Sequence, residues 1–132
     1  MITILVDMSI RNTSLLSLEI ESETVFIDMN DIDEICESSY VKSFSTLKEN
    51  IKGLTLINNN ILPVISYSGN IKTPVKGVVV KNIKPIFFLA VESIGTIFQK
   101  DVDELEKTDE KFIYKSGEIK LINIKEIERY LA

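Results

Sequence analysis

The sequence contains no histidine, and this absence removes the commonest general base and the commonest metal ligand. Neither a Ser–His nor a Cys–His nucleophile can be assembled from this chain. One cysteine, Cys36, without any histidine cannot build a zinc site. The five glycines lie too far apart for a phosphate-cradling loop. We therefore expect no catalytic residue, no metal and no cofactor, and we take a binding role as the default.

The sequence also lacks long apolar runs, paired cysteines and an excess of positive charge. The longest uninterrupted apolar run is Ile86–Val91, well short of the ~20 residues of a membrane-spanning helix. Met1–Val6 is too short for the core of a signal peptide. The single cysteine is typical of an intracellular protein. A net charge of −5 argues against a nucleic-acid partner. We expect a cytoplasmic protein without direct membrane insertion.

What is present is a composition suited to a folded globule. The chain has 132 residues, of which 45% are hydrophobic and 27% are charged. That balance favours a packed core over disorder, and the length suits one compact domain over residues 1–132.

The clearest local signal is a hairpin in Ile51–Tyr67. Two aliphatic runs, Leu54–Ile57 and Ile61–Ile65, flank three consecutive asparagines, a residue type that tolerates left-handed backbone angles. Gly53 precedes the first run, where a backbone can pass close. Pro63 cannot donate to a sheet ladder, which predicts an edge strand or a bulge at that position.

Turn signals recur about every ten residues along the rest of the chain, and they predict eight or nine short strands with one helix. Asp28–Glu34 fits either a strand or a helix, and Ser43–Lys52 is expected to hold one helical turn capped by Ser45. Asn123 and Glu126 form a capping-box pattern before a C-terminal helix. This pattern favours small β-barrels or a sandwich over a parallel α/β fold. The remaining expected elements are a strand at Ile2–Val6, a connection at Met8–Ser14, a hairpin of Leu15–Ile20 with Thr24–Met29, strands at Val75–Val80 and Ile86–Ile97, and a hairpin of Phe112–Tyr114 with Glu118–Ile122.

Four motifs occur in an order and spacing that resembles the CheW family of chemotaxis coupling proteins. They are Ile32-Asp33-Glu34-Ile35 for the family's Val-x-Glu-Val, Gly53 and Pro63 at the family's ten-residue spacing, Leu89-Ala90-Val91-Glu92-Ser93-Ile94, and Leu121-Ile122-Asn123-Ile124. The resemblance spans about Leu15 to Leu131. It implies two small five-stranded SH3-like β-barrels packed side by side, with a short C-terminal helix and no enzymatic activity.

The departures from the family pattern fall on polar positions, apart from one at Phe88. They are Asn58-Asn59 for Arg-Gly, Ser66 for Asp, Phe88 for Gly, and Glu92 and Asn123 for two Asp residues. Apolar positions are retained, as packing requires, while polar positions have drifted. The fold therefore follows from the resemblance more directly than the partners do.

The resemblance implies two protein partners: the cytoplasmic tip of a chemoreceptor and the regulatory domain of a CheA-type histidine kinase. The residues at the family's receptor-contact positions are Ile32, Glu34, Ile35, Gly53 and Asn58. The alternative for Ile32 and Ile35 is core packing, for Gly53 a backbone requirement, and for Glu34 a solvated carboxylate. Asn58 stands where the family has the arginine that pairs with this glutamate, so we expect Glu34 to remain hydrated and without a cationic partner.

Two other functions remain open at this point. One is a divergent CheW-like adaptor that serves another signalling pathway or lacks one of the two partners. The other is a small β-barrel ligand-binding module, against which the acidic balance and the lack of a basic, aromatic-lined face argue.

Overall fold

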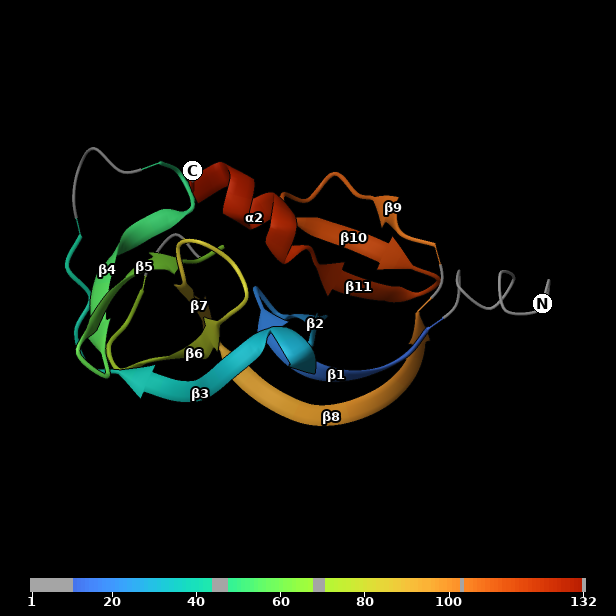
Figure 1. Cartoon of the computed structure of the whole chain (residues 1–132), viewed down its shortest axis with the longest axis horizontal. Helices are drawn as coiled ribbons and strands as arrows, with labels where there is room; N and C mark the ends of the chain where they lie inside the picture. The colour runs from blue at the N-terminus through green and yellow to red at the C-terminus, as the bar shows by residue number, and fades with distance from the viewer. Residues whose placement is uncertain (1–10, 44–47, 68–70, 103, 132) are drawn as a thin grey trace.

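The computed structural model describes residues 11–43, 48–67, 71–102 and 104–131, and it consists of two small β-sheets side by side with one short α-helix (Figure 1). The expected strand at Ile2–Val6 and the expected cap at Ser45 lie outside these residues. Eleven strands are present in the described part of the chain, more than the eight or nine predicted. The expected class, mainly β with two sheets and a short C-terminal helix, is confirmed.

The first sheet has six strands drawn from both ends of the described chain. Its order is β8 (Ser93–Val102), β1 (Arg11–Ile20), β2 (Glu23–Asp28), β11 (Ile119–Ile122), β10 (Ile113–Ser116) and β9 (Glu106–Lys107). β1 and β2 form the predicted hairpin, and positive φ angles at Glu21 and Ser22 provide its two-residue turn. β2 and β11 pair in parallel.

The second sheet has five strands from one continuous stretch of chain. Its order is β3 (Ile32–Ser38), β6 (Val75–Val80), β7 (Phe87–Val91), β5 (Asn60–Ile65) and β4 (Ile51–Ile57). A short 3-10 helix, η1 (Met29–Asp31), leads from β2 into β3 and resolves the ambiguity over Asp28–Glu34. The two ends of this sheet meet at a backbone bridge between Lys42 and Leu54, with two 2.8 Å hydrogen bonds, and through side-chain contacts such as the hydrogen bond between Ser38 and Thr55. Neither sheet is therefore a fully closed barrel, contrary to the expectation of two five-stranded barrels.

Three expectations about the strands were wrong. Arg11–Ser14 is strand rather than connection because it pairs with the end of β8. The run Ile86–Ile97 contains two strands, which separate at Glu92. Pro63 lies in β5, an inner strand, and its missing N–H is tolerated because the pairing of β5 with β7 begins only at Val64.

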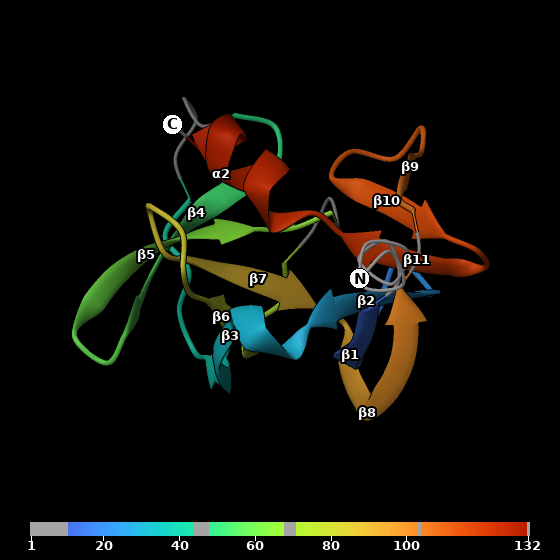
Figure 2. The same ribbon diagram turned by 45° about the vertical axis from the view of Figure 1, so that its right-hand side comes forward.

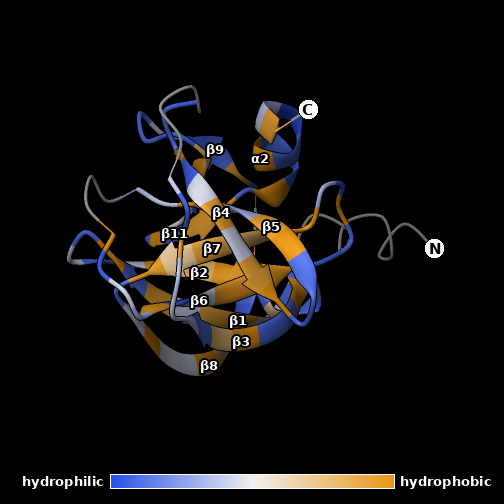
Figure 3. Ribbon diagram, turned by 90° about the vertical axis from the view of Figure 1, so that its left-hand side faces the viewer, coloured by the Kyte–Doolittle hydropathy of each residue, from blue (hydrophilic) through white to orange (hydrophobic). Residues whose placement is uncertain are grey.

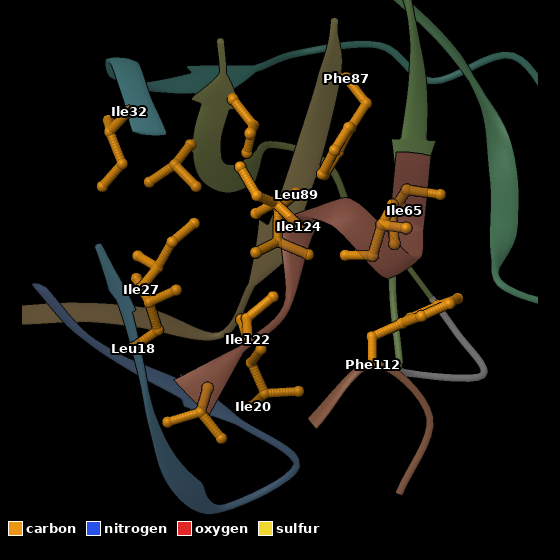
Figure 4. Close-up of a cluster of buried hydrophobic side chains, with 14 of the residues drawn as sticks. Leu18, Ile20, Ile27, Ile32, Ile65, Phe87, Leu89, Phe112, Ile122 and Ile124 are labelled. Atoms are coloured by element: carbon orange, nitrogen blue, oxygen red, sulfur yellow. The ribbon is translucent and has the colours of Figure 1, made fainter. Parts of the chain in front are cut away.

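A single apolar cluster, here called the shared core, joins the two sheets (Figure 4). β1 contributes Leu16 and Leu18, β7 contributes Phe87 and Leu89, and α2 (Ile124–Leu131) contributes Ile127. Each of these side chains is at most 2% exposed, so each sheet supplies one wall of the same interior. Smaller clusters fill the space behind each sheet.

The helix α2 begins as predicted and lies over the junction of the sheets (Figures 1 and 2). The Asn123 side chain accepts a 3.1 Å hydrogen bond from the Glu126 N–H, as an N-cap residue does. The reciprocal half of the capping box is replaced, because the Asn123 N–H donates to the Phe112 carbonyl at 2.8 Å. At the other end, the Tyr130 ring packs against Phe112, with the Lys111 ammonium 3.9 Å from its centre.

Candidate protein-interaction site

Glu34 and Asn58 are brought together by the structure. The Asn58 side-chain amide donates a 2.7 Å hydrogen bond to a Glu34 carboxylate oxygen, which links β3 to the β4–β5 turn. The expected loss of the family's cationic partner at this position therefore does not leave the Glu34 carboxylate without a hydrogen-bond donor. A neutral amide occupies the position of the family's arginine and retains the contact, while the local charge is one unit more negative.

The turn that carries Asn58 has the geometry its sequence demands. Asn58 and Asn59 both have positive φ, at 50° and 64°, as a two-residue hairpin turn of the favoured twist requires. Ile57 and Asn60 close the turn as a pair. The asparagines therefore have two roles, since both supply the left-handed backbone and one also holds Glu34.

Ile35 is directed away from the protein interior, whereas Ile32 is not. Ile35 is 47% exposed, while Ile32 is 8% exposed and packs in the shared core. Successive residues of a strand alternate between its two faces, so two isoleucines three residues apart point to opposite sides of β3. Ile32 thus matches the core-packing alternative, and Ile35 is available to a partner.

Gly53 meets a backbone requirement. A Cβ atom there would lie 2.8 Å from Val41 Cγ1 and closer still to the carbonyl oxygen of Lys42. This is the place where Lys42 bridges to Leu54. Gly53 therefore allows the chain after β3 to approach β4, and it is buried rather than presented to a partner.

Two exposed apolar residues on the β4–β5 hairpin were not predicted as site residues. Leu56 and Ile61 face each other across the hairpin and are 64% and 71% exposed. Figure 3 shows the hairpin on the outer side of the molecule. We refer to these two residues, with Glu34, Ile35 and Asn58 of β3 and the β4–β5 turn, as the hairpin surface. The sequence did not indicate them, because both faces of this hairpin are largely apolar; in the structure their immediate neighbours Thr55 and Leu62 face inward.

Cys36 lies on β3 behind this surface. It is partly buried against the core of the five-stranded sheet. Burial, and secondly the negative charge of Glu34, raise the pKa of the Cys36 thiol. The thiol is therefore less readily ionised than an ordinary cysteine, in agreement with an inert rather than a reactive role.

A second concave feature, here called the inter-sheet cleft, lies where the two sheets meet. Its volume is about 320 Å³, at the small end of the range for ligand pockets. Ile20, Val75 and Ala90 give it an apolar floor, and charged residues of both signs stand at its rim. Val91 and Glu92 of the third sequence motif line it, but none of the five predicted site residues does.

Two classes of site are not found within the described residues. They contain no group of three or more side chains suited to a metal ion. No helix among them is long and apolar enough to cross a membrane.

These features define a β-sheet scaffold with exposed apolar and charged surfaces. No protein-family model matches the sequence, and no curated protein matches it. A solved structure is similar, the crystal structure of the scaffolding protein TtCheW from Thermoanaerobacter tengcongensis. The similarity has a TM-score of 0.65 at 17% sequence identity and covers 85% of this chain and 88% of the other. The fold is therefore CheW-like, as the sequence motifs predicted.

Proposed function

We propose that this protein is a non-catalytic adaptor of chemotaxis signal transduction in the cytoplasm. In this role it couples the cytoplasmic tips of chemoreceptors to the regulatory domain of a CheA-type histidine kinase. The observation that carries the proposal is the CheW-like fold, which extends over 85% of the chain. The four motifs in order, and the retained contact between Glu34 and Asn58, support it independently.

A coupling role needs two separate surfaces, and the protein offers two of suitable kind. The hairpin surface presents exposed apolar side chains and a hydrogen-bonded carboxylate. The inter-sheet cleft presents an apolar floor with a charged rim. An amphipathic helix docks on an apolar groove with charged borders. We assign the receptor tip to the hairpin surface, following the position of the predicted residues.

The first experiment is titration calorimetry against the regulatory domain of the kinase encoded in the same genome. We expect a micromolar dissociation constant, because small interfaces below about 1,200 Å² are usually weak and transient. An absence of heat at about tens of micromolar, where a micromolar complex of about −8 kcal/mol would form, contradicts the kinase half of the proposal.

The receptor half is tested with Ile61→Lys. Ile61 is 71% exposed, so the substitution alters the hairpin surface without disturbing a core. We expect affinity for a receptor-tip fragment to fall by about tenfold or more, as for loss of an apolar contact of at least 1.4 kcal/mol. The matched control is Ile86→Lys, at another exposed isoleucine (43%) outside this surface, which should bind as wild type does. Equal affinities of the wild type, Ile61→Lys and Ile86→Lys for the receptor-tip fragment would show that the receptor does not bind at the hairpin surface.

Asn58→Arg tests whether this position influences partner choice. The arginine restores a cation beside Glu34, and a surface ion pair changes stability by less than about 1 kcal/mol. We expect the variant to gain affinity for a receptor tip of the commoner type more than for its own. Binding of both tips to both proteins is the measurement. An unchanged preference shows that Asn58 does not determine partner choice.

The second candidate is a divergent CheW-like adaptor that binds one partner only or serves another pathway. The neutral amide at Asn58, in place of the family's arginine, favours it. Binding to a receptor tip without binding to the kinase domain, or the reverse, distinguishes it from the first candidate.

A further inference from the structure

The strand β8 has one free edge. It stands at the end of the six-stranded sheet with β1 on one side, and no strand among the described residues pairs with its other side. Figure 1 shows β8 as the outermost arc of the molecule. An edge strand presents unpaired N–H and C=O groups, which are a template for pairing with another chain.

The pairing of β1 determines which backbone groups of β8 are free. The two-residue turn at Glu21-Ser22 makes Ile20 and Glu23 a hydrogen-bonded pair. Bonding alternates along an antiparallel strand, so Thr13 and Leu15 direct their N–H and C=O groups away from β2 and toward β8.

The partners of these two residues on β8 are Lys100 and Phe98. Their backbone groups are consequently bonded to β1. The alternate residues, Ile97, Gln99 and Asp101, direct their backbone N–H and C=O groups outward from the sheet.

The free edge is apolar on both faces of the sheet. Ile97 is 58% exposed and Phe98 is 41% exposed, and adjacent residues of a strand point to opposite faces. Phe98 already makes an edge-to-face contact with Phe26, at 5.9 Å between ring centres. Ser93–Gln99 contains no charged residue, so the usual protection of an edge by lysine is missing from this part.

We propose that β8 pairs with β8 of a second copy of this chain to form a weak symmetric dimer, in antiparallel register about Phe98. In this register Phe98 stands opposite itself in a non-hydrogen-bonded pair, where side chains approach most closely. Ile97 stands opposite Gln99, so that the outward groups of both residues bond across the interface.

Charge distribution supports a second copy as the occupant. In this register Lys100 stands opposite Thr96 and Asp101 opposite Gly95, so no like charges meet. Opposed like charges would destabilise a cross-strand pair. The side chain of Asp101 is also occupied, since it accepts a 3.0 Å hydrogen bond from Asn12.

A bulge limits the length of the pairing. The register of β1 with β8 shifts between Leu16 and Leu18, and the Ser17 hydroxyl accepts a 2.9 Å bond from the Thr96 N–H. Regular pairing is thus confined to about Thr96–Lys100 of each copy. Such a small contact gives a weak dimer, with a dissociation constant on the order of 0.1 mM, as expected for interfaces well below about 1,200 Å². The proposal does not depend on the adaptor role.

Sedimentation equilibrium of the full chain from about 10 μM to 1 mM tests the proposal. We expect the average mass to rise from 15.0 kDa toward twice that value. Ile97→Lys and Gln99→Pro should each weaken association by about tenfold or more. Gln99→Pro removes an outward N–H and leaves the ladder to β1 intact. Ile86→Lys is the matched control and should associate as wild type does.

A cross-linking measurement tests the register. In a Cys36→Ser background, Phe98→Cys places two thiols opposite each other in a dimer, within reach of a disulfide. Lys100→Cys places them several residues apart and should remain uncross-linked. A monomer at about 1 mM overturns the proposal. So does a dimer that is insensitive to both β8 variants, or one in which Lys100→Cys cross-links as readily as Phe98→Cys. Circular dichroism of each variant verifies that it is folded.

Discussion

At Gly53 the fold depends on a missing side chain. Two segments, the chain after β3 and the strand β4, approach so closely there that a methyl group would meet the Lys42 carbonyl and Val41. We expect Gly53→Ala to lower the free energy of unfolding by about 1–3 kcal/mol, as overpacking does. Urea unfolding followed by circular dichroism measures this.

The matched control for this prediction is Leu56→Ala on the same strand. Leu56 is 64% exposed, so its truncation should change stability by about 0.5 kcal/mol or less. If Gly53→Ala is as stable as this control, the chain after β3 does not need its close approach to β4.

Glu34 and Cys36 give a second prediction at the scale of single residues. Burial and the Glu34 charge both disfavour the thiolate and raise the thiol pKa, so Cys36 should react slowly with alkylating reagents at neutral pH. Glu34→Gln removes the electrostatic cause and leaves the burial. The pKa should fall, and the pH–rate profile of alkylation should move to lower pH.

Glu37→Gln is the control for that measurement. Glu37 lies on the same strand and is exposed, yet its charge is not among the causes of the Cys36 shift. A profile that moves equally in both variants would mean that overall charge, rather than proximity of Glu34, controls the thiol.

Among the structural elements, α2 depends on its cap. The Asn123 side chain satisfies one of the first free N–H groups of an eight-residue helix. We expect Asn123→Ala to cost about 1 kcal/mol of unfolding free energy, and Asn123→Asp to cost much less, because aspartate caps equally well. Thermal unfolding of both variants measures the difference. Equal losses of stability would show that the side-chain oxygen at position 123 does not stabilise the helix as a cap.

The sequence predicted well those elements whose conformation is determined by their own residues. The turns at Asn58-Asn59 and at Gly117 depend on residue types that tolerate positive φ, and such residues are visible in the sequence. The errors arose where a distant strand decides. Arg11–Ser14 and Lys100-Asp101 are polar or charged, and their mutual pairing makes them strand.

The same division applies to the candidate site. Glu34, Ile35 and Asn58 were predicted from a resemblance; the structure joins Glu34 to Asn58 by a hydrogen bond and leaves Ile35 exposed. Exposure of Leu56 and Ile61 was missed because both faces of the hairpin are apolar in sequence. Only the packing of Thr55 and Leu62 against the interior shows which face is left outside.

At the scale of the whole molecule, the shared core should make the two sheets unfold together. Ile127 of α2 is fully buried between them. We expect Ile127→Ala to cost about 2–5 kcal/mol and to accelerate amide exchange of β1 and β7 alike when exchange is followed by NMR. Protection lost in one sheet only would show that the sheets are separate cooperative units.

The composition of the two sheets has a consequence for how the protein is made. All five strands of the second sheet lie between Ile32 and Val91, whereas the first sheet combines β1 and β2 with β10 and β11. During synthesis the five-stranded sheet can assemble as soon as β7 has left the ribosome. The six-stranded sheet cannot be completed then, because β11, the parallel neighbour of β2, is synthesised later. Until then Phe87 and Leu89 lack the cover that Ile122, Ile124 and Ile127 later provide. The nascent chain therefore passes through a stage in which the five-stranded sheet is formed but one of its apolar faces is exposed to solvent. A chaperone or a second nascent chain would bind at this stage.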